Sequence, residues 1–331
     1  MRVGIMGLRE GHIQGMLAAV MQAPGVELVG VVEPDVEICQ RVLDGRKVRR
    51  FPTLGDMIAT ARPELILEGL KHNDKLELVE KAAAAGIHLL LDKPLCSNEE
   101  QWLRMKKAVD TSGIKISMWF TARNHKPFIA LRERILAGEL GDLVSFVSTH
   151  PHRLRAEPPW WYMDPTIYAG TFHDLAGHGV DMIRWLSGAE YTGVHAVAST
   201  KKRYHEHPTL TEHVQASFTL SDGAGAVLTA DWLTPPTSPY WADTRFIVMG
   251  SKGSAHLRSY AQDHVLVFSD SRGSTELPLD TVLPEASAIE MIAALESGRE
   301  LFVSTEDVFS VAKACLAAEK SVRDGGSFIH I

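Results

Sequence analysis

The sequence RVGIMGLREGH at residues 2–12 decides the fold class of the first part of the chain. Its apolar run at 2–6 leads into a short loop, and a helical pattern over 12–22 precedes a second apolar run at 26–32. Two buried strands joined through a tight loop and a helix form the βαβ unit of a parallel sheet. We therefore expect a Rossmann-type dinucleotide-binding domain.

The same alternation continues to about residue 120. Further strands are predicted at 64–68, 87–91 and 114–120. One helix is predicted from an Asn73 cap to Ala85. Another opens at the capping box Ser97–Glu100 and ends at Gly113. The pattern predicts an α/β domain over residues 1–121, built on a doubly wound parallel sheet.

Residues 122–331 show a different pattern of predicted strands and helices. Strands are predicted at 142–149, 192–201, 211–220, 224–233, 244–250, 254–260 and 264–268, and helices at 127–137, 170–186, 285–297 and 305–323. Tight turns at 221–223 and 250–253 make the strands they join antiparallel. We expect an α+β substrate-binding domain with a large, open, mainly antiparallel sheet, whose far face forms a homodimer or homotetramer.

Length, charge and cysteine content indicate which kinds of protein this chain can be. The 331 residues suffice for about two domains, and the formal net charge of −7 argues against nucleic acid or an anionic membrane as a partner. The three cysteines show no Cys-x-x-Cys spacing, and no apolar run approaches the ~20 residues of a membrane span. The chain enters an apolar strand without a charged leader. We expect a soluble, cytoplasmic protein.

The loop after the first strand lies where a G-x-G-x-x-G fingerprint binds the pyrophosphate of a dinucleotide. The three glycine positions hold Gly7, Arg9 and His12, so only the first matches. Gly11 lies one position early, and Arg9 or the start of the helix offers positive charge to a phosphate. Two interpretations stay open. The loop, with Leu8, binds pyrophosphate irregularly, or it is a strand–helix turn that binds nothing.

Glu33 directly follows the second predicted strand, 26 residues after Gly7. An acidic side chain at this position hydrogen-bonds the ribose hydroxyls of NAD and repels the 2′-phosphate of NADP. The alternative is an ordinary exposed glutamate at a strand end. Position and topology together favour NAD over NADP.

Two further motifs contain residues suited to catalysis. LLLDKPL at 89–95 ends a predicted strand and contains Lys93, whereas AGTFHDLAGH at 169–178 opens a predicted helix and contains Asp174 and His178. Residues four apart share one helix face. By itself this spacing favours the polar side of an amphipathic helix, but Lys93 favours a site, because ligands bind at the carboxyl ends of parallel strands.

Together with the order of elements, these motifs resemble the glucose–fructose oxidoreductase / inositol dehydrogenase / rhizopine-catabolism (Gfo/Idh/MocA) family, which carries Glu-Lys-Pro and Asp-x-x-x-His segments. The resemblance implies an NAD(H)-dependent oxidoreductase acting on a sugar, polyol or related hydroxy compound. It also implies that Lys93 and His178 lie beside the reacting carbinol carbon as an acid–base pair. His178 is then the general base, Lys93 polarises the oxygen, and Asp174 orients the base or binds a substrate hydroxyl.

The chain departs from the family pattern at four positions. Asp92 replaces the glutamate before Lys93. In the loop after the strand at 64–68, Lys71, His72 and Lys75 replace the usual proline, asparagine and histidine. Because this loop flanks the cofactor in the family, His72 is a candidate cofactor neighbour.

Other aromatic and basic residues are candidates for substrate binding. Trp161 and Tyr162 precede the second motif, and their rings either stack on a sugar or pack beneath the loop. Arg123 and His152 complete the predicted substrate set with Asp174.

Histidines raise the alternative of a metal site. His150 and His152 alternate on a predicted strand end and so point the same way. With Asp174 and His178 they offer ligands for a divalent ion. We expect no metal, because a scattered pair of histidines more often makes hydrogen bonds.

Two other functions remain as alternatives to the dehydrogenase. One is a non-redox lyase or glycosidase, with or without a metal, which the irregular loop and the histidines would suit. The other is a non-catalytic sensor of a nucleotide or sugar. The set of Lys93, Asp174 and His178 argues against the sensor, which needs no acid–base lysine.

Overall fold

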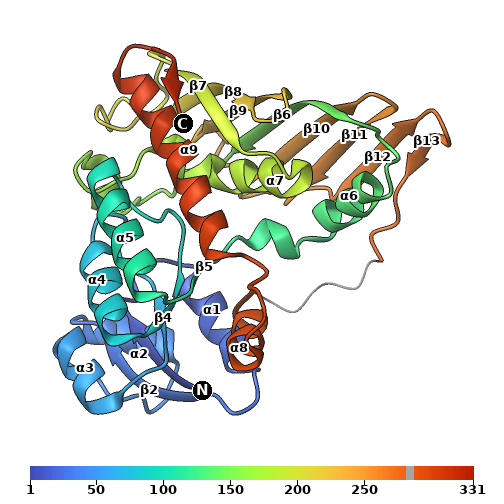
Figure 1. Ribbon diagram of the computed structural model, residues 1–331. Coiled ribbons are helices and arrows are strands. Elements are labelled where there is room, and N and C mark those ends of the chain that lie inside the picture. Colours follow the sequence, from blue (N-terminus) through green and yellow to red (C-terminus); the bar gives the residue numbers. More distant parts are fainter. Residues whose placement is uncertain (281–286) are drawn as a thin grey trace. The chain divides into compact units, whose positions relative to one another are not determined.

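The computed structural model describes residues 1–280 and 287–331 of the chain (Figure 1). It divides into two compact units. The first comprises Met1–Phe120 with Glu285–Phe309, and the second comprises Thr121–Pro284 with Ser310–Ile331.

The first unit is built on a five-stranded sheet of order β2-β1-β3-β4-β5, parallel throughout. Its strands are β1 (Arg2–Met6), β2 (Glu27–Val32), β3 (Leu65–Glu68), β4 (His88–Leu91) and β5 (Ile116–Met118). Val3, Ile5 and Leu67 are fully buried, as in a sheet covered by helices on both faces. The predicted doubly wound sheet is confirmed. Its order reverses between β1 and β3, where ligands bind in such sheets.

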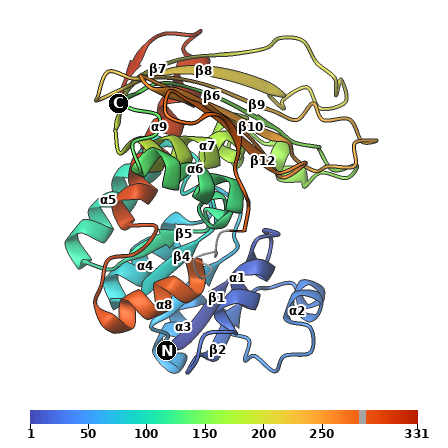
Figure 2. The ribbon, with the colours of Figure 1, turned by 90° about the vertical axis from the view of Figure 1, so that its right-hand side faces the viewer.

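Six helices of the described chain belong to this unit: α1 (Ile13–Val20), α2 (Val36–Leu43), α3 (Leu54–Ala61), α4 (Leu76–Ala85), α5 (Glu99–Ser112) and α8 (Ser287–Ser297). Helix α1 contacts α8, and α4 contacts α5 (Figure 2). Asn98 caps α5 by accepting from the Gln101 amide, and Gly86 ends α4 in the left-handed region. Helix α4 begins after Lys75 rather than at the predicted Asn73 cap.

Helix α8 departs from the domain boundary expected at 121/122. Its Ala288, Met291 and Ile292 belong to the same apolar cluster as Val3 and Ile13 of the Rossmann core. The chain therefore returns to the first unit near its C-terminal end. The change in the pattern of strands and helices along the sequence does not reveal this return. The first two residues of the predicted helix at 285–297 lie outside the described residues.

The second unit contains a nine-stranded sheet of order β13-β12-β11-β10-β6-β9-β8-β7-β14. The strands are β6 (Leu143–Pro151), β7 (Tyr191–Ala198), β8 (His213–Leu220), β9 (Gly225–Asp231), β10 (Thr244–Gly250), β11 (Gly253–Ser259), β12 (His264–Ser269), β13 (Gly273–Glu276) and β14 (Ile329–His330). All neighbours are antiparallel except β6 and β9. The predicted large, mainly antiparallel sheet is confirmed.

Helix α6 (Lys126–Leu136) contacts strands β11 and β12 of this sheet, and α7 (Gly177–Ser187) contacts β6. Helix α9 (Thr305–Arg323) is the last helix before the end of the chain (Figure 1). The helix predicted at 170–186 is wrong in its first turn. Phe172–Ala176 form a π-helical turn, and α7 begins only after it. Within the described ranges, no helix combines the length and the apolar character that crossing a membrane requires.

Candidate active site

The loop after β1 turns tightly at Gly7. Gly7 has a φ of +76°, and a Cβ there would overlap Leu70 and press on Gly69, just after β3. The amides of Arg9 and Glu10 both donate to the Gly69 carbonyl, at 2.7 and 3.2 Å. The loop is thus closed onto the end of β3, at the point where the strand order reverses.

The start of α1 keeps its first amides available. Within the described residues, the amides of Gly11 and His12 donate no hydrogen bond. The first N–H groups of a helix have no partner in their own helix, and they carry partial positive charge. This end of α1 therefore has donors for an anion.

Glu33 lies at the end of β2, as predicted, but its side chain is only 1% exposed. Its Oε2 accepts from the Leu8 amide at 3.0 Å, and its Oε1 accepts from the Arg9 guanidinium at 3.1 Å and the Asp35 amide at 3.0 Å. The Arg9 guanidinium also lies 3.8 Å from the Asp35 carboxylate. A carboxylate accepts about four hydrogen bonds, so one position is left for a ribose hydroxyl. That contact stays a prediction.

His12 and Asp92 form an ion pair beside this loop. The His12 Nδ1 lies 2.9 and 3.2 Å from the two carboxylate oxygens of Asp92, which directly follows β4. Asp92 is fully buried, whereas the His12 side chain is 41% exposed. The Asp92 charge raises the pKa of His12 above its ordinary value, although burial and Lys93 oppose it. Burial opposes ionisation of Asp92, but His12, Lys75 and Lys93 outweigh it and lower the pKa of Asp92.

A second, fully buried ion pair lies next to the first. The Lys75 Nζ lies 3.0 Å from Glu68 Oε2, and it donates to the carbonyls of Asp92 at 2.6 Å and Pro94 at 2.9 Å. Glu68 also accepts from the Asp92 amide at 3.1 Å. Burial raises the pKa of Glu68, and Lys75 counteracts it. These contacts hold the backbone on both sides of Lys93.

The other predicted residues of the first unit lie on neighbouring segments. Lys93 is half-buried at the carboxyl end of β4. His72 is buried in the segment after β3. The cofactor contacts predicted for both residues remain predictions.

In the second unit, His178 lies on α7, whereas Asp174 lies on the π-helical turn before it. The wider turn means that the two do not share the face of one regular α-helix. Asp174 is buried and His178 is half-buried. Single π-helical turns occur frequently at functional sites.

Glu319 of α9 holds the amino end of this turn. Its Oε1 accepts from the amides of Phe172 at 2.8 Å and His173 at 3.3 Å. Gly170 has a φ of +100°, and a Cβ there would overlap the Glu319 carboxylate. Burial raises the pKa of Glu319 to about 7, although the two amides oppose the shift.

Aromatic rings cluster around the predicted substrate residues. The ring of Trp161 lies 4.5 Å from that of Tyr162, which stacks on Tyr168 at 4.9 Å and lies 5.8 Å from Trp232. Trp161, Tyr168 and Trp232 are buried, whereas Tyr162 is half-buried. Packing therefore explains most of this cluster, and Tyr162 has the ring most open to a ligand.

Tyr168 connects the aromatic cluster to Asp174. Its hydroxyl donates to Asp174 Oδ2 at 3.0 Å and accepts from the Trp232 Nε1 at 3.3 Å. Burial, with the nearby Asp174 charge, raises the pKa of Tyr168 well above its ordinary value, so the hydroxyl stays protonated. His152 lies with its ring 6.0 Å from that of Trp232. Four predicted substrate residues, His152, Trp161, Tyr162 and Asp174, are thus brought together.

Arg123, the fifth predicted substrate residue, forms a buried ion pair with Asp181 of α7. Its guanidinium is buried and donates to both carboxylate oxygens of Asp181, at 2.9 and 2.6 Å. It also lies 5.7 Å from the ring centre of Trp185. Its predicted substrate contact remains a prediction.

His150 is buried between β6 and α7. Its Nε2 and the Ser148 hydroxyl are hydrogen-bonded at 2.7 Å, and a Cβ at Gly179 would overlap its ring. Burial lowers the pKa of His150 to about 3, so the ring is neutral. Among the described residues, no group of three or more His, Cys, Asp and Glu side chains is arranged to hold a metal ion.

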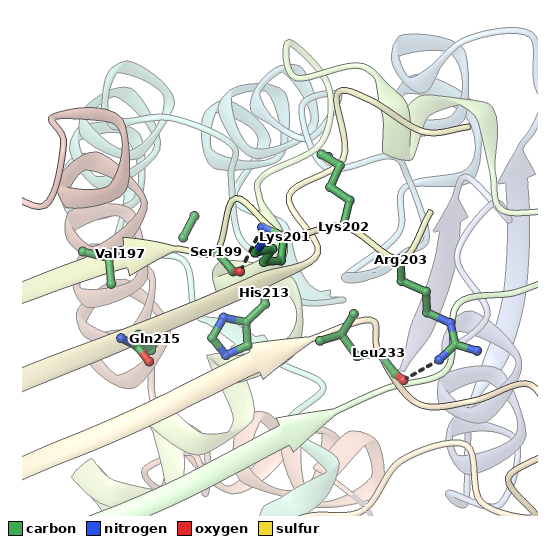
Figure 3. A pocket seen from close by; sticks show the side chains of 9 residues that line it. Val197, Ser199, Lys201, Lys202, Arg203, His213, Gln215 and Leu233 are labelled. Carbon is green, nitrogen blue, oxygen red and sulfur yellow. Dashed lines mark hydrogen bonds between the residues drawn. The ribbon is translucent and has the colours of Figure 1, made fainter. Parts of the chain in front are cut away.

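A pocket of about 560 Å³ lies elsewhere on the second unit, where Figure 3 shows Lys201, Lys202, Arg203 and His213 around it. None of the predicted site residues lines it. The Lys202 Nζ donates to the Leu210 carbonyl, and Arg203 donates to the carbonyl of Leu233. Two of the basic side chains around this pocket therefore already donate hydrogen bonds to backbone carbonyls.

The sequence patterns miss several residues of the candidate site. Tyr168 lies six residues before Asp174, and a polar aromatic so near the motif was a usable signal. Trp232 and Glu319 lie far away along the chain, and no local pattern connects them to Asp174. Lys75 lies close to Glu68 along the chain, but its contacts with the carbonyls of Asp92 and Pro94 join the segment after β3 to the segment after β4, which only the fold brings together.

Family models match both units of the chain. A model described as an oxidoreductase family with an NAD-binding Rossmann fold matches residues 1–120, and a model of the GFO/IDH/MocA C-terminal domain matches residues 128–256.

Curated relatives of similar length also match. The scyllo-inositol 2-dehydrogenase (NAD(+)) of Bacillus subtilis (strain 168) is 26% identical over 347 residues, covering 98% of this chain and 94% of the relative. The rhizopine catabolism protein MocA of Rhizobium meliloti is 26% identical over 260 residues, covering 78% of each chain.

A solved structure has the same fold. The WlbA dehydrogenase from Bordetella pertussis, in complex with NADH and UDP-GlcNAcA, aligns with a TM-score of 0.85 over 100% of this chain and 97% of that one. The two sequences are 21% identical, so the likeness concerns the fold alone.

Proposed function

The chain belongs to the Gfo/Idh/MocA family of NAD-binding oxidoreductases, and from this premise we propose that it transfers hydride between NAD and a carbinol carbon of a sugar or polyol. The substrate class is supported by the dehydrogenases among its relatives, one of which is named for scyllo-inositol. The cluster of Tyr162, Tyr168 and Asp174 also supports it, because aromatic rings and a carboxylate suit a polyhydroxylated ring.

The first unit fits a dinucleotide at the phosphate loop. Gly7 makes the tight turn, and the amides of Gly11 and His12 remain for the pyrophosphate. The Arg9 side chain does not obstruct them, because its guanidinium is held by Glu33 and Asp35. When bound, NAD supplies the hydride acceptor or donor.

We propose that Lys93 and His178 act on the same hydroxyl group. His178 takes the hydroxyl proton during oxidation, and Lys93 donates a hydrogen bond to the oxygen. Asp174 accepts a hydrogen bond from a neighbouring substrate hydroxyl. The pairing of Lys93 with His178 rests on the family resemblance.

One observation carries the chemical part of the proposal. The backbone around Lys93 is held by Glu68 and Lys75, two fully buried charged residues that contact Asp92 and Pro94. Burying charged groups is costly, and here the ion pair and the hydrogen bonds to the backbone offset that cost. The arrangement fixes a lysine at the carboxyl end of a parallel strand, where ligands of such sheets bind.

The test is the near-ultraviolet absorbance of NADH, followed while purified protein is incubated with NAD and a panel of inositols and aldoses. We expect turnover of at least one polyol, and we expect Lys93→Ala and His178→Ala to lower kcat by a factor of about 10² to 10⁴. Lys107→Ala, an exposed lysine on α5, is the matched control and should keep full activity. Absence of NAD binding by calorimetry would overturn the proposal.

We further propose that the protein works in the cytoplasm as a homodimer or homotetramer through the outer face of the large sheet. Val227, Met249 and Phe268 are exposed on strands β9, β10 and β12. The three cysteines, all within the described ranges, are buried and form no disulfide, which suits a reducing compartment. Light scattering measures the oligomer, and a monomer at micromolar concentration would contradict this assignment.

A further inference from the structure

A departure from the glycine fingerprint and a departure from the family pattern meet in one contact. His12 stands at the third glycine position of the fingerprint, and Asp92 stands where the family carries glutamate. The structure pairs them directly, with His12 Nδ1 2.9 Å from Asp92 Oδ1. A glutamate at 92 would extend one methylene group further, into the position of the imidazole. The shorter acid and the histidine therefore suit each other.

We propose that His12, held by Asp92, binds the diphosphate of the dinucleotide as a cation, replacing the close backbone approach that the missing glycines would allow. The inference rests on the proposed function only through its cofactor. It gives the irregular loop a way to bind phosphate with a side chain.

The position of His12 suits this role. It is the residue immediately before α1, and its own amide and that of Gly11 are free to donate within the described part of the chain. Its Nδ1 is occupied by Asp92, which leaves Nε2 as the second donor of the protonated ring. The side chain is 41% exposed, so a ligand can reach it. A charged donor and two amides then converge on one anion.

The surroundings keep the imidazole charged. Asp92 and Glu10 favour the protonated ring, whereas burial and Lys93 oppose it, and the balance raises its pKa. Arg9 is engaged by Glu33 and Asp35. His12 therefore provides a positive charge that pH can remove.

The role of Asp92 is that of a positioning residue. Its carboxylate is buried, and its own amide and carbonyl are bound by Glu68 and Lys75. The carboxylate thus has a fixed place from which it orients the His12 ring. It acts on the ligand only through His12.

The experiment measures the dissociation constants of ADP-ribose and of adenosine by calorimetry between about pH 6 and 9, the range that covers a raised imidazole pKa. The diphosphate diester of ADP-ribose keeps its charge over this range, and adenosine has no phosphate. For the unmodified protein we expect the Kd of ADP-ribose to rise about tenfold or more as the pH rises, the equivalent of one charge-assisted hydrogen bond. The Kd of adenosine should stay constant.

Variants separate the charge from the fold. His12→Gln should bind ADP-ribose about tenfold more weakly at low pH, without the pH dependence. His12→Lys keeps the charge and should bind with little pH dependence. Asp92→Asn should move the transition to lower pH, because the imidazole loses its buried anion. His88→Gln, at the opposite end of β4, is the matched control and should behave like the unmodified protein.

The outcomes distinguish this inference from the proposed function. If the unmodified protein binds neither NAD nor ADP-ribose, the proposed function fails. If NAD-dependent turnover is observed but His12→Gln keeps the unmodified affinity and pH profile, only the role of His12 is overturned. Equal weakening of adenosine in His12→Gln would also overturn it, because that loss would not involve phosphate.

Discussion

The buried charged groups near Lys93 and those near Asp174 are stabilised in different ways. Near Lys93 each meets an opposite charge, as in the pairs Lys75–Glu68 and His12–Asp92. At the π-helical turn two acids accept from neutral donors: Asp174 accepts from the Tyr168 hydroxyl, and Glu319 accepts from two backbone amides. In the first region an opposite charge offsets the cost of burying each charged group. In the second region, hydrogen bonds to neutral donors or protonation of the acid lower that cost. The two regions should therefore respond differently to mutation and to pH.

Lys75→Met should have the largest effect, because it leaves Glu68 buried without its cation. Removing one partner of a buried ion pair costs about 3–5 kcal/mol in the free energy of unfolding. Two backbone carbonyls, of Asp92 and Pro94, also lose their donor. Urea denaturation at pH 7 measures the loss, which should shrink at lower pH as Glu68 becomes protonated.

The matched control is the double variant Glu68→Gln, Lys75→Met, which removes both charges. It should recover a large part of the lost stability, because no uncompensated charge remains. Equal loss in the single and double variants would mean that the ion pair is not what holds this region.

The fold was largely predictable because both sheets leave periodic patterns. Apolar runs alternate with helices before residue 120, and tight turns such as 250–253 separate the later strands. Helix α3 and strands β13 and β14 were missed, since these elements are short and the strands mostly polar. The place of α8 depends on a return of the chain to the core around Val3, which no local pattern contains.

The candidate site was predictable only in part. Motif positions identified Lys93, Asp174 and His178, whose roles remain predictions. The pairing of His12 with Asp92 joins residues 80 positions apart, and it depends on the fold bringing the start of α1 to the end of β4 rather than on spacing. Glu319 reaches Phe172 from 147 positions away, so its role could come only from the packing of α9.

Glu319→Gln should reveal the free-energy cost of burying an ionisable carboxyl group among neutral donors. The pKa of Glu319 is raised to about 7, so the folded protein keeps a proton that the unfolded chain releases near pH 4.5. The unmodified protein therefore loses stability as pH rises from 4.5 to about 7, by roughly 3 kcal/mol at ~1.4 kcal/mol for each pKa unit. Glutamine still accepts from the Phe172 amide and does not ionise.

Urea denaturation of both proteins at matched pH values measures this difference. The variant should gain stability relative to the unmodified protein over that pH window, and the gain should level off above it. A difference that does not change with pH would show that folding does not raise the pKa of Glu319.

Gly179→Ala tests whether a neutral histidine in the second region is a packing residue. The new Cβ would overlap the buried ring of His150, and overpacking of this kind costs about 1–3 kcal/mol. Gly179→Ala should cost less stability in a protein that already carries His150→Ala, because the shorter side chain leaves room for the new Cβ. Thermal denaturation measures all three. If the two substitutions add without coupling, the contact does not limit packing.

Tyr168→Phe should have the smallest effect, about 1 kcal/mol in the free energy of unfolding, because it removes one neutral hydroxyl and keeps the ring stacked on Tyr162. Asp174 then loses a donor, so we expect a higher KM for the substrate rather than weaker binding of ADP-ribose. Steady-state kinetics and calorimetry on the same variant separate these effects. Loss of ADP-ribose affinity would contradict the division into a charge-compensated cofactor region and a hydrogen-bonded substrate region.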